Sequence, residues 1–135
     1  MSNNIRKGRH CVFNLHVHLV FVTKYRREIF TAAILQSLQK IFQKVCEVND
    51  TILVECNGER DHVHLLLHYP PTSNVAKIVN SLKGVSSRML RQKHPEIHYA
   101  YWRGVLWSPS YFAASCGGAP IDIIKLYIER QNRPD

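Results

Sequence analysis

The chain lacks the features that mark membrane and secreted proteins. None of its apolar runs reaches the roughly 18 residues that a membrane helix needs. Its N-terminus is charged, and the first apolar stretch is interrupted by His16 and His18, which does not fit a secretory signal peptide. We therefore expect a cytoplasmic protein that has no membrane partner.

Cysteine is scarce and scattered. The chain has four cysteines, and no two of them form a Cys-x-x-Cys pair, which argues against a zinc knuckle. In a reducing cytoplasm we expect all four to be free, mostly buried thiols. They are Cys11, Cys46, Cys56 and Cys116.

Acidic residues are also few, with 10 Asp and Glu against 18 Lys and Arg, so the formal net charge is +8. A small basic domain favours a polyanionic partner, and nucleic acid is the leading candidate. The alternative is a generic surface charge, but the cations are clustered. The residues that we expect to contact DNA are Arg6, Lys7, Arg9, Lys24, Arg26, Arg27, Lys77, Lys83, Arg88, Arg91 and Arg103.

The 135 residues suffice for one domain with a hydrophobic core, and 45% of them are hydrophobic. Apolar periodicity predicts strands over 12–23, 51–55, 62–68 and 105–115, with helices over 31–49 and 75–93. A last helix is expected over 119–131, and residues 1–10 read as a flexible basic arm. The order matches an α+β fold of the ferredoxin-like or RRM-like type, an antiparallel sheet with two helices on one face.

Local patterns place the ends and faces of these elements. Thr31 is a suitable N-cap for the first helix, and the Asn57-Gly58 pair predicts a hairpin turn before the His62–His68 strand. For the second helix the spacing predicts a core face made of Val75, Ile78, Leu82, Val85 and Met89.

The segment 61–67 contains a His-hydrophobe-His triplet inside an apolar run. Side chains alternate faces along a strand, so His62 and His64 point the same way and Val63 points the other way. Two imidazoles about 6–7 Å apart on one strand face can bind a single metal ion. One triplet is a weak indication, because such histidines more often pack or face solvent.

A second triplet, His16-Val17-His18, lies on the first predicted strand. Adjacent strands can bring the four histidines of the two triplets near one another. For His16 we favour packing or hydrogen bonding on the sheet, whereas His18 stays open as a residue beside the metal ligands.

The predicted C-terminal helix carries Tyr127 beside its apolar stripe, roughly 80° from the centre of the stripe. Gln131 lies one turn further along on the same flank. The stripe consists of Ile121, Ile124 and Ile128. A partly exposed hydroxyl and an amide oxygen could thus meet a metal held by the paired histidines. That combination suggests phosphodiester cleavage through a tyrosyl intermediate.

Two further groups of residues have open interpretations. On the second helix, Lys77, Arg88 and Arg91 lie with Gly84 away from the apolar face, where they either approach a sugar-phosphate backbone or simply face solvent. Six of the thirteen aromatic residues fall within 99–112. Unpaired bases stack on such rings for about 1–3 kcal/mol each, yet we expect core packing for at least half of them.

Five ordered blocks of the sequence resemble the single-tyrosine HUH transposases, the small TnpA-type enzymes of bacterial insertion sequences, in which HUH stands for His-hydrophobe-His. The blocks are HLVFVTKYRR at 18–27, DHVHLLL at 61–67, SLKG at 81–84, LWSPSYF at 106–112 and YIE-x-Q at 127–131. Together they cover most of the chain, and in this order they are more specific than any one block.

The resemblance implies a bacterial, cytoplasmic, homodimeric enzyme that recognises hairpins and acts on single-stranded DNA. It implies that Tyr127 is the nucleophile and forms a 5′-phosphotyrosine bond. It further implies that His62 and His64 bind Mg²⁺ or Mn²⁺, with Gln131 as a third ligand. Asp61 and His18 are candidates for supporting positions. Where relatives often carry Met-Pro before the Asp, this chain has Glu59-Arg60, which leaves a metal role for Asp61 open.

Two alternatives remain. The first keeps the chemistry and changes the biology, as in a domesticated HUH nuclease that acts on chromosomal repeat hairpins, or a nickase. The second is a non-catalytic RRM-like module that binds nucleic acid. Such a module would carry aromatic residues on its central strands, where this chain carries histidines.

Overall fold

The computed structural model describes residues 5–100, 105–115 and 127–131, with the backbone alone at 99–100. Three of the strands are longer than four residues: β3 (Leu15–Val22), β4 (Ile52–Gly58) and β5 (His62–Tyr69). The others are β1 (Arg6–Lys7), β2 (Val12–Phe13) and β6 (Phe112–Ser115). The helices are α1 (Ala32–Val48), α2 (Val75–Lys93) and α3 (Pro95–Ala100), and a 3-10 turn covers Lys24–Arg26.

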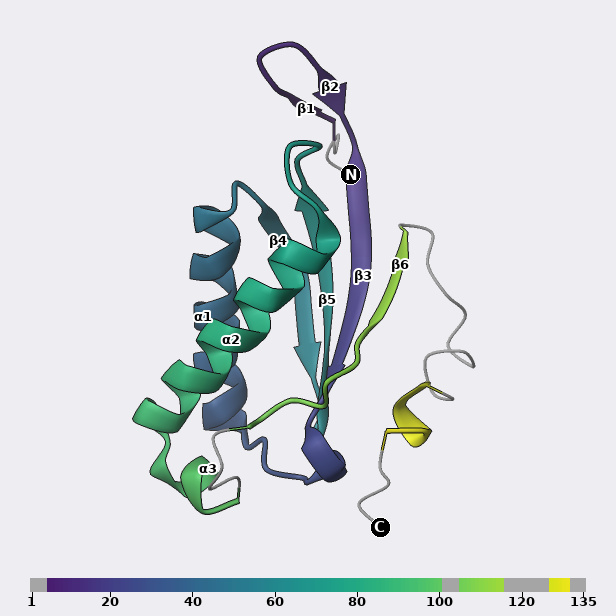
Figure 1. The fold of residues 1–135 in the computed structure, drawn as a ribbon. Helices are drawn as coiled ribbons and strands as arrows, with labels where there is room; N and C mark the ends of the chain where they lie inside the picture. The colour runs from purple at the N-terminus through teal and green to yellow at the C-terminus, as the bar shows by residue number, and fades with distance from the viewer. Residues whose placement is uncertain (1–4, 101–104, 116–126, 132–135) are drawn as a thin grey trace.

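Four of the strands form one antiparallel sheet in the order β4-β5-β3-β6, so β5 and β3 are its two central strands. Helices α1 and α2 both lie against one face of this sheet (Figure 1). This confirms the predicted ferredoxin-like α+β fold.

The two central strands divide their side chains between two faces. Leu19 and Phe21 of β3 and Leu65 of β5 point into the core under the helices, where each is at most 1% exposed. The residues that alternate with these along each strand, including His62 and His64 of β5, point to the opposite face. In the pairing of β3 with β5, Val20 lies opposite His64.

Helix α1 confirms the predicted N-cap at Thr31. The Thr31 hydroxyl accepts a hydrogen bond from the backbone N–H of Ile34, which satisfies one of the free donors of the first turn. The buried side chains follow the predicted helical spacing and include Ile34, Leu38, Ile41, Phe42 and Val45.

The predicted core face of α2 is only partly right. Ile78 and Leu82 are buried as expected, but Met89 is 41% exposed, and Leu90 is buried in its place. The buried face also includes the polar residue Ser86, which accepts a hydrogen bond from the indole N–H of Trp107 at 2.9 Å. Sequence periodicity could not identify that partner, since the two residues come from different elements.

The turn predicted at Asn57-Gly58 is wrong. Both residues belong to β4, and the hairpin closes one step later, where the Glu59 N–H donates to the His62 carbonyl at 2.8 Å. A methyl group added at Gly58 would collide with Leu35 of α1 and lie 3.2 Å from Val63. The glycine therefore allows close approach of the helix rather than a turn.

The predicted flexible arm contains a short hairpin, in which β1 pairs with β2. Arg6 anchors it to the domain, because its guanidinium donates to the His68 carbonyl at 3.1 Å and lies 3.5 Å from the Asp50 carboxylate. The same group lies 5.0 Å from the centre of the Phe13 ring. The described part of the predicted arm therefore has secondary structure of its own and is in contact with the domain.

The strand predicted over 105–115 is much shorter, and helix α3 was not expected. Only Phe112–Ser115 joins the sheet, next to β3, while Trp107 makes a single bridge to Thr23. Trp107 is 4% exposed and packs among the rings of Phe21, Phe30 and Phe42. No helix in the described part of the chain is long and apolar enough to cross a membrane.

The corrected face of α2 gives a matched pair of variants. Replacing Leu90 by alanine is expected to lower the free energy of unfolding by roughly 2–5 kcal/mol, because it leaves a cavity in the core. Met89→Ala, its neighbour, is expected to cost less than about 1 kcal/mol because Met89 is exposed. Urea unfolding of both variants measures the difference, and a larger loss for Met89→Ala would contradict the observed packing.

Candidate active site

The two histidines of the β5 triplet lie side by side on the open face of the sheet. Their ring centres are 5.0 Å apart, with an angle of 75° between the ring planes. Both side chains are half-buried. The structure therefore brings His62 and His64 together as the sequence predicted.

Asp61 orients the first histidine. The Nδ1 of His62 lies 2.8 Å from one carboxylate oxygen of Asp61, and the Nε of Arg26 lies 3.0 Å from the other. A carboxylate accepts from Nδ1–H, which leaves the lone pair on Nε2 of His62 free. Metal-binding histidines are commonly held in this way by a carboxylate. Each oxygen of Asp61 thus has a partner, His62 for one and Arg26 for the other.

Arg26, which the sequence placed among the DNA contacts, reaches Asp61 from an unusual turn. Tyr25 and Arg26 have φ angles of 63° and 53°, in the left-handed region that non-glycine residues seldom adopt. The hydroxyl of Thr23 anchors the start of this turn by donating to the Arg27 carbonyl at 2.9 Å and lies 3.2 Å from the Asp61 carbonyl. The turn therefore brings the basic segment onto the histidine strand.

Burial keeps the second histidine neutral. Desolvation, followed by the nearby charges of His62 and His18, lowers the pKa of His64 to about 4. His18 lies across the strand pair, with its ring centre 5.6 Å from that of His64, and burial lowers its pKa as well. His64 is thus an uncharged imidazole at neutral pH, the form that binds metals.

The remaining two histidines of this face form a separate pair. His16 and His68 lie opposite each other in the β3–β5 pairing, and their rings stack with centres 4.3 Å apart. Both are buried, and their Nε2 atoms have no hydrogen-bond partner. This agrees with packing as the role of His16.

The segment that carries the tyrosine lies on the same face as the histidines, opposite α1 and α2 (Figure 1). Ile128 is buried against Val20 and Val22 of β3, and those two residues are the register partners of His64 and His62. Residues 127–129 are helical. Residues 130–131 form a turn, and residues 119–126 of the predicted helix, including Ile121 and Ile124, lie outside the described residues.

Two serines that the sequence analysis did not single out contact Tyr127 and Gln131. The Ser110 hydroxyl lies 2.8 Å from the phenol oxygen of Tyr127 and donates to the Gln131 amide oxygen at 2.8 Å. The Ser108 hydroxyl donates to the same amide oxygen at 3.0 Å. The Ser-Pro-Ser sequence was visible in the 106–112 block, but nothing in its spacing indicated these contacts.

Burial raises the pKa of the Tyr127 phenol, and the hydrogen bond with Ser110 only partly offsets the effect. The ring of Tyr127 packs against Phe112, with centres 5.8 Å apart. Tyr127 is therefore half-buried and protonated at neutral pH.

The donor set suits a divalent cation only in part. Two neighbouring imidazoles, one of them oriented by a carboxylate, are ligands that suit a divalent metal such as Mn²⁺. Among the residues that the structure describes, no three His, Cys, Asp or Glu side chains form a group that could hold a metal. The Gln131 oxygen already accepts two hydroxyls, and it would have to exchange one of them to become a ligand.

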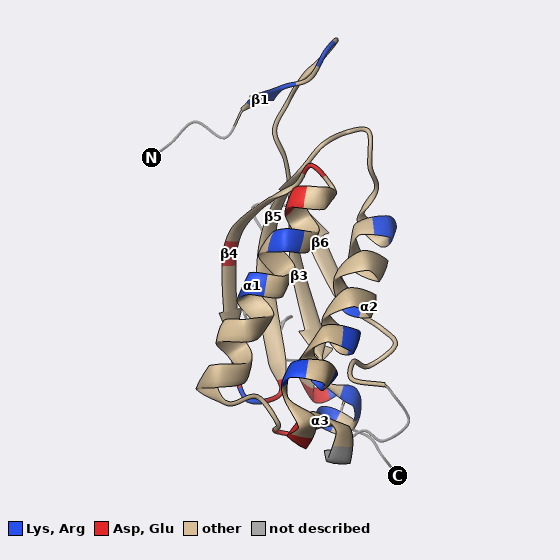
Figure 2. Cartoon of the chain, turned by 90° about the vertical axis from the view of Figure 1, so that its left-hand side faces the viewer, with Lys and Arg blue, Asp and Glu red and all other residues tan. Residues whose placement is uncertain are grey.

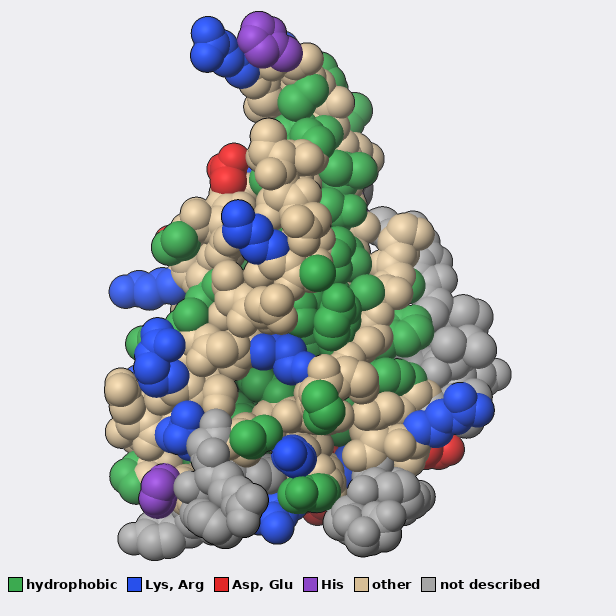
Figure 3. All heavy atoms as spheres, in the orientation of Figure 1, with side chains coloured by type: hydrophobic (Ala, Val, Ile, Leu, Met, Phe, Trp, Pro, Cys, Tyr) green, Lys and Arg blue, Asp and Glu red, His purple; other side chains and the backbone are tan. Residues whose placement is uncertain are grey.

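The predicted DNA contacts fall into separate regions. Arg9 and Lys7 are exposed on the β1–β2 hairpin, and basic and histidine side chains are visible at its far tip (Figure 3). Lys24 and Arg27 lie at the turn beside Asp61, each within 6 Å of the Tyr25 ring centre, Lys24 at 5.5 Å and Arg27 at 5.6 Å. Arg103 lies outside the described residues.

A third region is the outer face of α1 and α2, where Lys and Arg gather (Figure 2). Lys77 and Arg88 are exposed there, and Arg91 is half-buried with its Nε on the Ser87 carbonyl at 3.2 Å. No neighbour would touch a methyl group added at Gly84, so this part of α2 is open.

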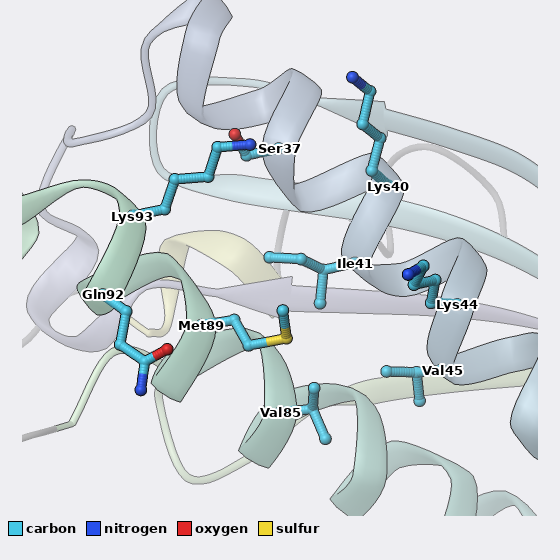
Figure 4. A pocket seen from close by; sticks show the side chains of 9 residues that line it. All are labelled: Ser37, Lys40, Ile41, Lys44, Val45, Val85, Met89, Gln92 and Lys93. Atoms are coloured by element: carbon cyan, nitrogen blue, oxygen red, sulfur yellow. The ribbon is translucent and has the colours of Figure 1, made fainter.

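A groove of about 380 Å³ between α1 and α2 adds cations that the sequence analysis missed (Figure 4). Its floor is apolar, and three lysines stand at its rim. The floor includes Ile41, Val45, Val85 and Met89, and the rim lysines are Lys40, Lys44 and Lys93. Lys40 and Lys44 come from α1 and Lys93 is the last residue of α2, so their convergence on one groove was not visible in the sequence.

Lys83 does not belong to that outer face. Its ammonium group lies against the 108–110 segment, 2.6 Å from the Ser108 carbonyl and 3.2 Å from the Ser110 carbonyl. Its half-buried position lowers the pKa of Lys83 through desolvation. The ammonium group of Lys83 is thus engaged within the protein, whereas the sequence analysis expected it to contact DNA.

Comparisons with known proteins agree on one family. A sequence profile described as "Transposase IS200 like" matches residues 11–131. The ISDra2 transposase TnpA of Deinococcus radiodurans is 31% identical over 128 residues, which are 95% of this chain and 91% of that protein. The transposase for insertion sequence element IS200 of Salmonella typhimurium LT2 is 31% identical over 126 residues, which are 93% and 82% of the two proteins.

Solved structures show the same fold. The crystal structure of a Deinococcus radiodurans R1 protein assigned as a transposase is 33% identical and superposes with a TM-score of 0.86, covering 93% of this chain and 97% of that one. A REP-associated tyrosine transposase bound to a REP hairpin has a TM-score of 0.54 at 12% identity, over 97% of this chain and 70% of that one. The second likeness concerns the fold alone.

The environment of His64 predicts its titration. Because burial disfavours the imidazolium form, His64 is expected to stay neutral from pH 8 down to pH 5 and to titrate at about pH 4, below the ordinary histidine value of about 6.5. NMR of protein with ¹³C-labelled histidine, without added metal and assigned with a His64→Ala variant, measures this midpoint. A midpoint above pH 6 would contradict the burial of the ring.

Proposed function

Because the chain belongs to the IS200-like transposase family, we propose that it is a DNA transposase that cleaves and rejoins single-stranded DNA at the ends of an insertion sequence, with Tyr127 as the nucleophile. The observation that carries this proposal is the placement of the tyrosine segment. Ile128 packs on the two β3 residues whose partners in β5 are His62 and His64, so phenol and imidazoles share one end of one sheet face.

The chemistry that follows from this arrangement is transfer of a phosphodiester bond to the phenol. The Tyr127 oxygen attacks the scissile phosphorus and forms a 5′-phosphotyrosine bond, while the bond to the 3′-oxygen breaks and the 3′-hydroxyl is released. The tyrosyl ester keeps the energy of the phosphodiester, so a second 3′-hydroxyl can reverse the step without ATP. Covalent catalysis of this kind divides strand exchange into two steps.

The chain must overcome a weak nucleophile, since burial raises the pKa of Tyr127. In the proposal, His62 and His64 hold Mg²⁺ or Mn²⁺, which would draw charge from the scissile phosphate and orient it. Asp61 fixes the tautomer and the orientation of His62. His18 lies beside His64, with the two ring centres 5.6 Å apart, and in the proposal it supports the position of that ring.

Recognition of DNA is proposed to use the exposed cations on the hairpin, at the 24–27 turn and on the outer face of α1 and α2. Such contacts hold the phosphate backbone and do not read sequence. One relative of the same fold is bound to a REP hairpin, which supports hairpin DNA as a substrate feature here. A homodimer is proposed from the family resemblance.

Tyr127 can be tested as the nucleophile by its covalent adduct with DNA. Wild-type protein incubated with single-stranded DNA from the flanks of its own gene is expected to give a covalent adduct on a denaturing gel when Mn²⁺ is present. Tyr127→Phe removes only the hydroxyl, so it should bind the same DNA in a filter-binding assay and give no adduct.

An adduct formed by the Tyr127→Phe variant would remove Tyr127 as the nucleophile. DNA binding by the wild type without any adduct, across all flanking strands and both metals, would favour the non-catalytic binding module. Cleavage of chromosomal repeat hairpins in preference to the flanks would favour a domesticated nuclease.

A further prediction concerns the metal. His62→Ala and His64→Ala each remove one proposed imidazole ligand and are expected to lower the rate of adduct formation at low Mg²⁺ by roughly 100-fold, the upper end of the cost of losing a residue that merely supports a metal ligand. His16→Ala, on the same face but at the other end of the strands, is the control and should keep most of the activity. Full activity of either ligand variant at low Mg²⁺ would refute the assignment.

A further inference from the structure

The segment 106–110 is held in place from three sides. Trp107 inserts into the core, the Ser108 N–H donates to the Val22 carbonyl at 2.8 Å, and the Lys24 N–H donates to the Leu106 carbonyl at 2.9 Å. The two backbone bonds tie the segment to the end of β3. Val22 is the register partner of His62, so the segment and His62 flank the same end of β3.

Lys83 supplies the third attachment. Its ammonium group donates to the carbonyls of Ser108 and Ser110, and it lies 5.8 Å from the ring centre of Phe21 and 5.9 Å from that of Tyr111. Hydrogen bonds from a charged donor are roughly twice as strong as neutral ones, and a half-buried charge needs such partners. One lysine of α2 therefore fixes two carbonyls that stand on either side of Pro109.

The hydroxyl groups of the same two serines determine a direction of hydrogen bonding. The Gln131 amide oxygen is an acceptor only, so Ser108 and Ser110 must both donate to it. A serine hydroxyl has a single hydrogen. Ser110 therefore accepts from the phenol of Tyr127 across the 2.8 Å contact between the two oxygens.

This arrangement sets the orientation of the nucleophile. The phenol hydrogen points at Ser110, so the lone pairs of the Tyr127 oxygen point elsewhere and are available to a phosphorus atom. If the phenol loses its hydrogen, the Ser110 hydroxyl can rotate and donate to the phenolate, while Ser108 alone still satisfies Gln131. One amide oxygen shared by two hydroxyls makes this exchange possible without an unpaired group.

We propose that Ser110 and Lys83 are positioning residues for Tyr127: Ser110 holds the phenol oxygen, and Lys83 holds the segment that carries Ser110. Neither residue touches the DNA in this role. The inference rests on the proposed function, because it concerns the nucleophile of that reaction. It also gives Lys83 a role that differs from the phosphate contact expected from its charge.

The test of Ser110 compares an alanine with a threonine. Under single-turnover conditions with saturating DNA and Mn²⁺, Ser110→Ala is expected to slow adduct formation roughly tenfold to 100-fold, the effect of one lost hydrogen bond together with a less well aligned nucleophile. The dissociation constant for DNA should stay within twofold. Ser110→Thr keeps the hydroxyl and should recover most of the rate, whereas a merely structural defect would not be rescued in this way.

The test of Lys83 separates positioning from DNA contact. Lys83→Met keeps the length of the side chain and removes the donors, so the adduct rate should fall about as far as in Ser110→Ala, with DNA affinity unchanged. The slope of log affinity against log salt should also stay the same. Loss of a phosphate contact would instead reduce that slope by about 0.7 for single-stranded DNA. Lys83→Arg keeps a charged donor and should restore part of the rate.

The outcomes are distinguishable from failure of the proposed function. If the wild type forms no adduct, the proposed function fails. If the wild type forms one and Ser110→Ala forms it within twofold of the same rate, the positioning proposal is overturned and the proposed function stands. If Lys83→Met fails to fold in a thermal unfolding assay, the Ser110 variants decide the test. Ser110 is exposed, so Ser110→Ala is expected to fold like the wild type.

Discussion

The pairing of β3 with β5 is the constraint on which the rest of the structure depends. It runs without a shift from Leu15↔Tyr69 to Val22↔His62. A slip by one residue would turn every side chain of a strand to the other face. Buried residues such as Phe21 and Leu65 make that slip costly, at about 1.5–3 kcal/mol for each apolar side chain exposed. The core therefore fixes the register, and the register fixes which face carries the histidines.

The sequence could predict what depends on periodicity. Alternation in β5 placed His62 and His64 on one face, and helical spacing with a capping threonine gave α1 almost to the residue. Prediction from the sequence failed where a contact between two distant elements determines the role of a residue. Gly58 looked like a turn residue because its partner Leu35 belongs to α1, and Lys83 looked like a phosphate contact because its acceptors lie 25 and 27 residues further along the chain.

The supporting residues of the site show the same division. Asp61 could be noticed in the sequence since it precedes the histidine strand, but its salt bridge to Arg26 depends on a left-handed turn at two non-glycine residues, which no propensity indicates. That turn is held by Thr23, which is buried and whose backbone N–H donates a hydrogen bond to the Asp61 carbonyl. A strained backbone held by several contacts is common where a side chain must be aimed, and here it aims a guanidinium at the carboxylate that orients His62.

Gln131 links the two halves of the proposed site. Family resemblance implies that its amide oxygen serves the metal, yet in this structure the oxygen accepts from Ser108 and Ser110. An amide oxygen has two lone pairs, so each new bond to a cation displaces a serine hydroxyl. Ser110 is the hydroxyl with a second partner nearby, the phenol of Tyr127, and it is therefore the less costly one to release. Because these contacts share one oxygen, the placement of the nucleophile and the ligation by Gln131 cannot be independent in the proposed mechanism.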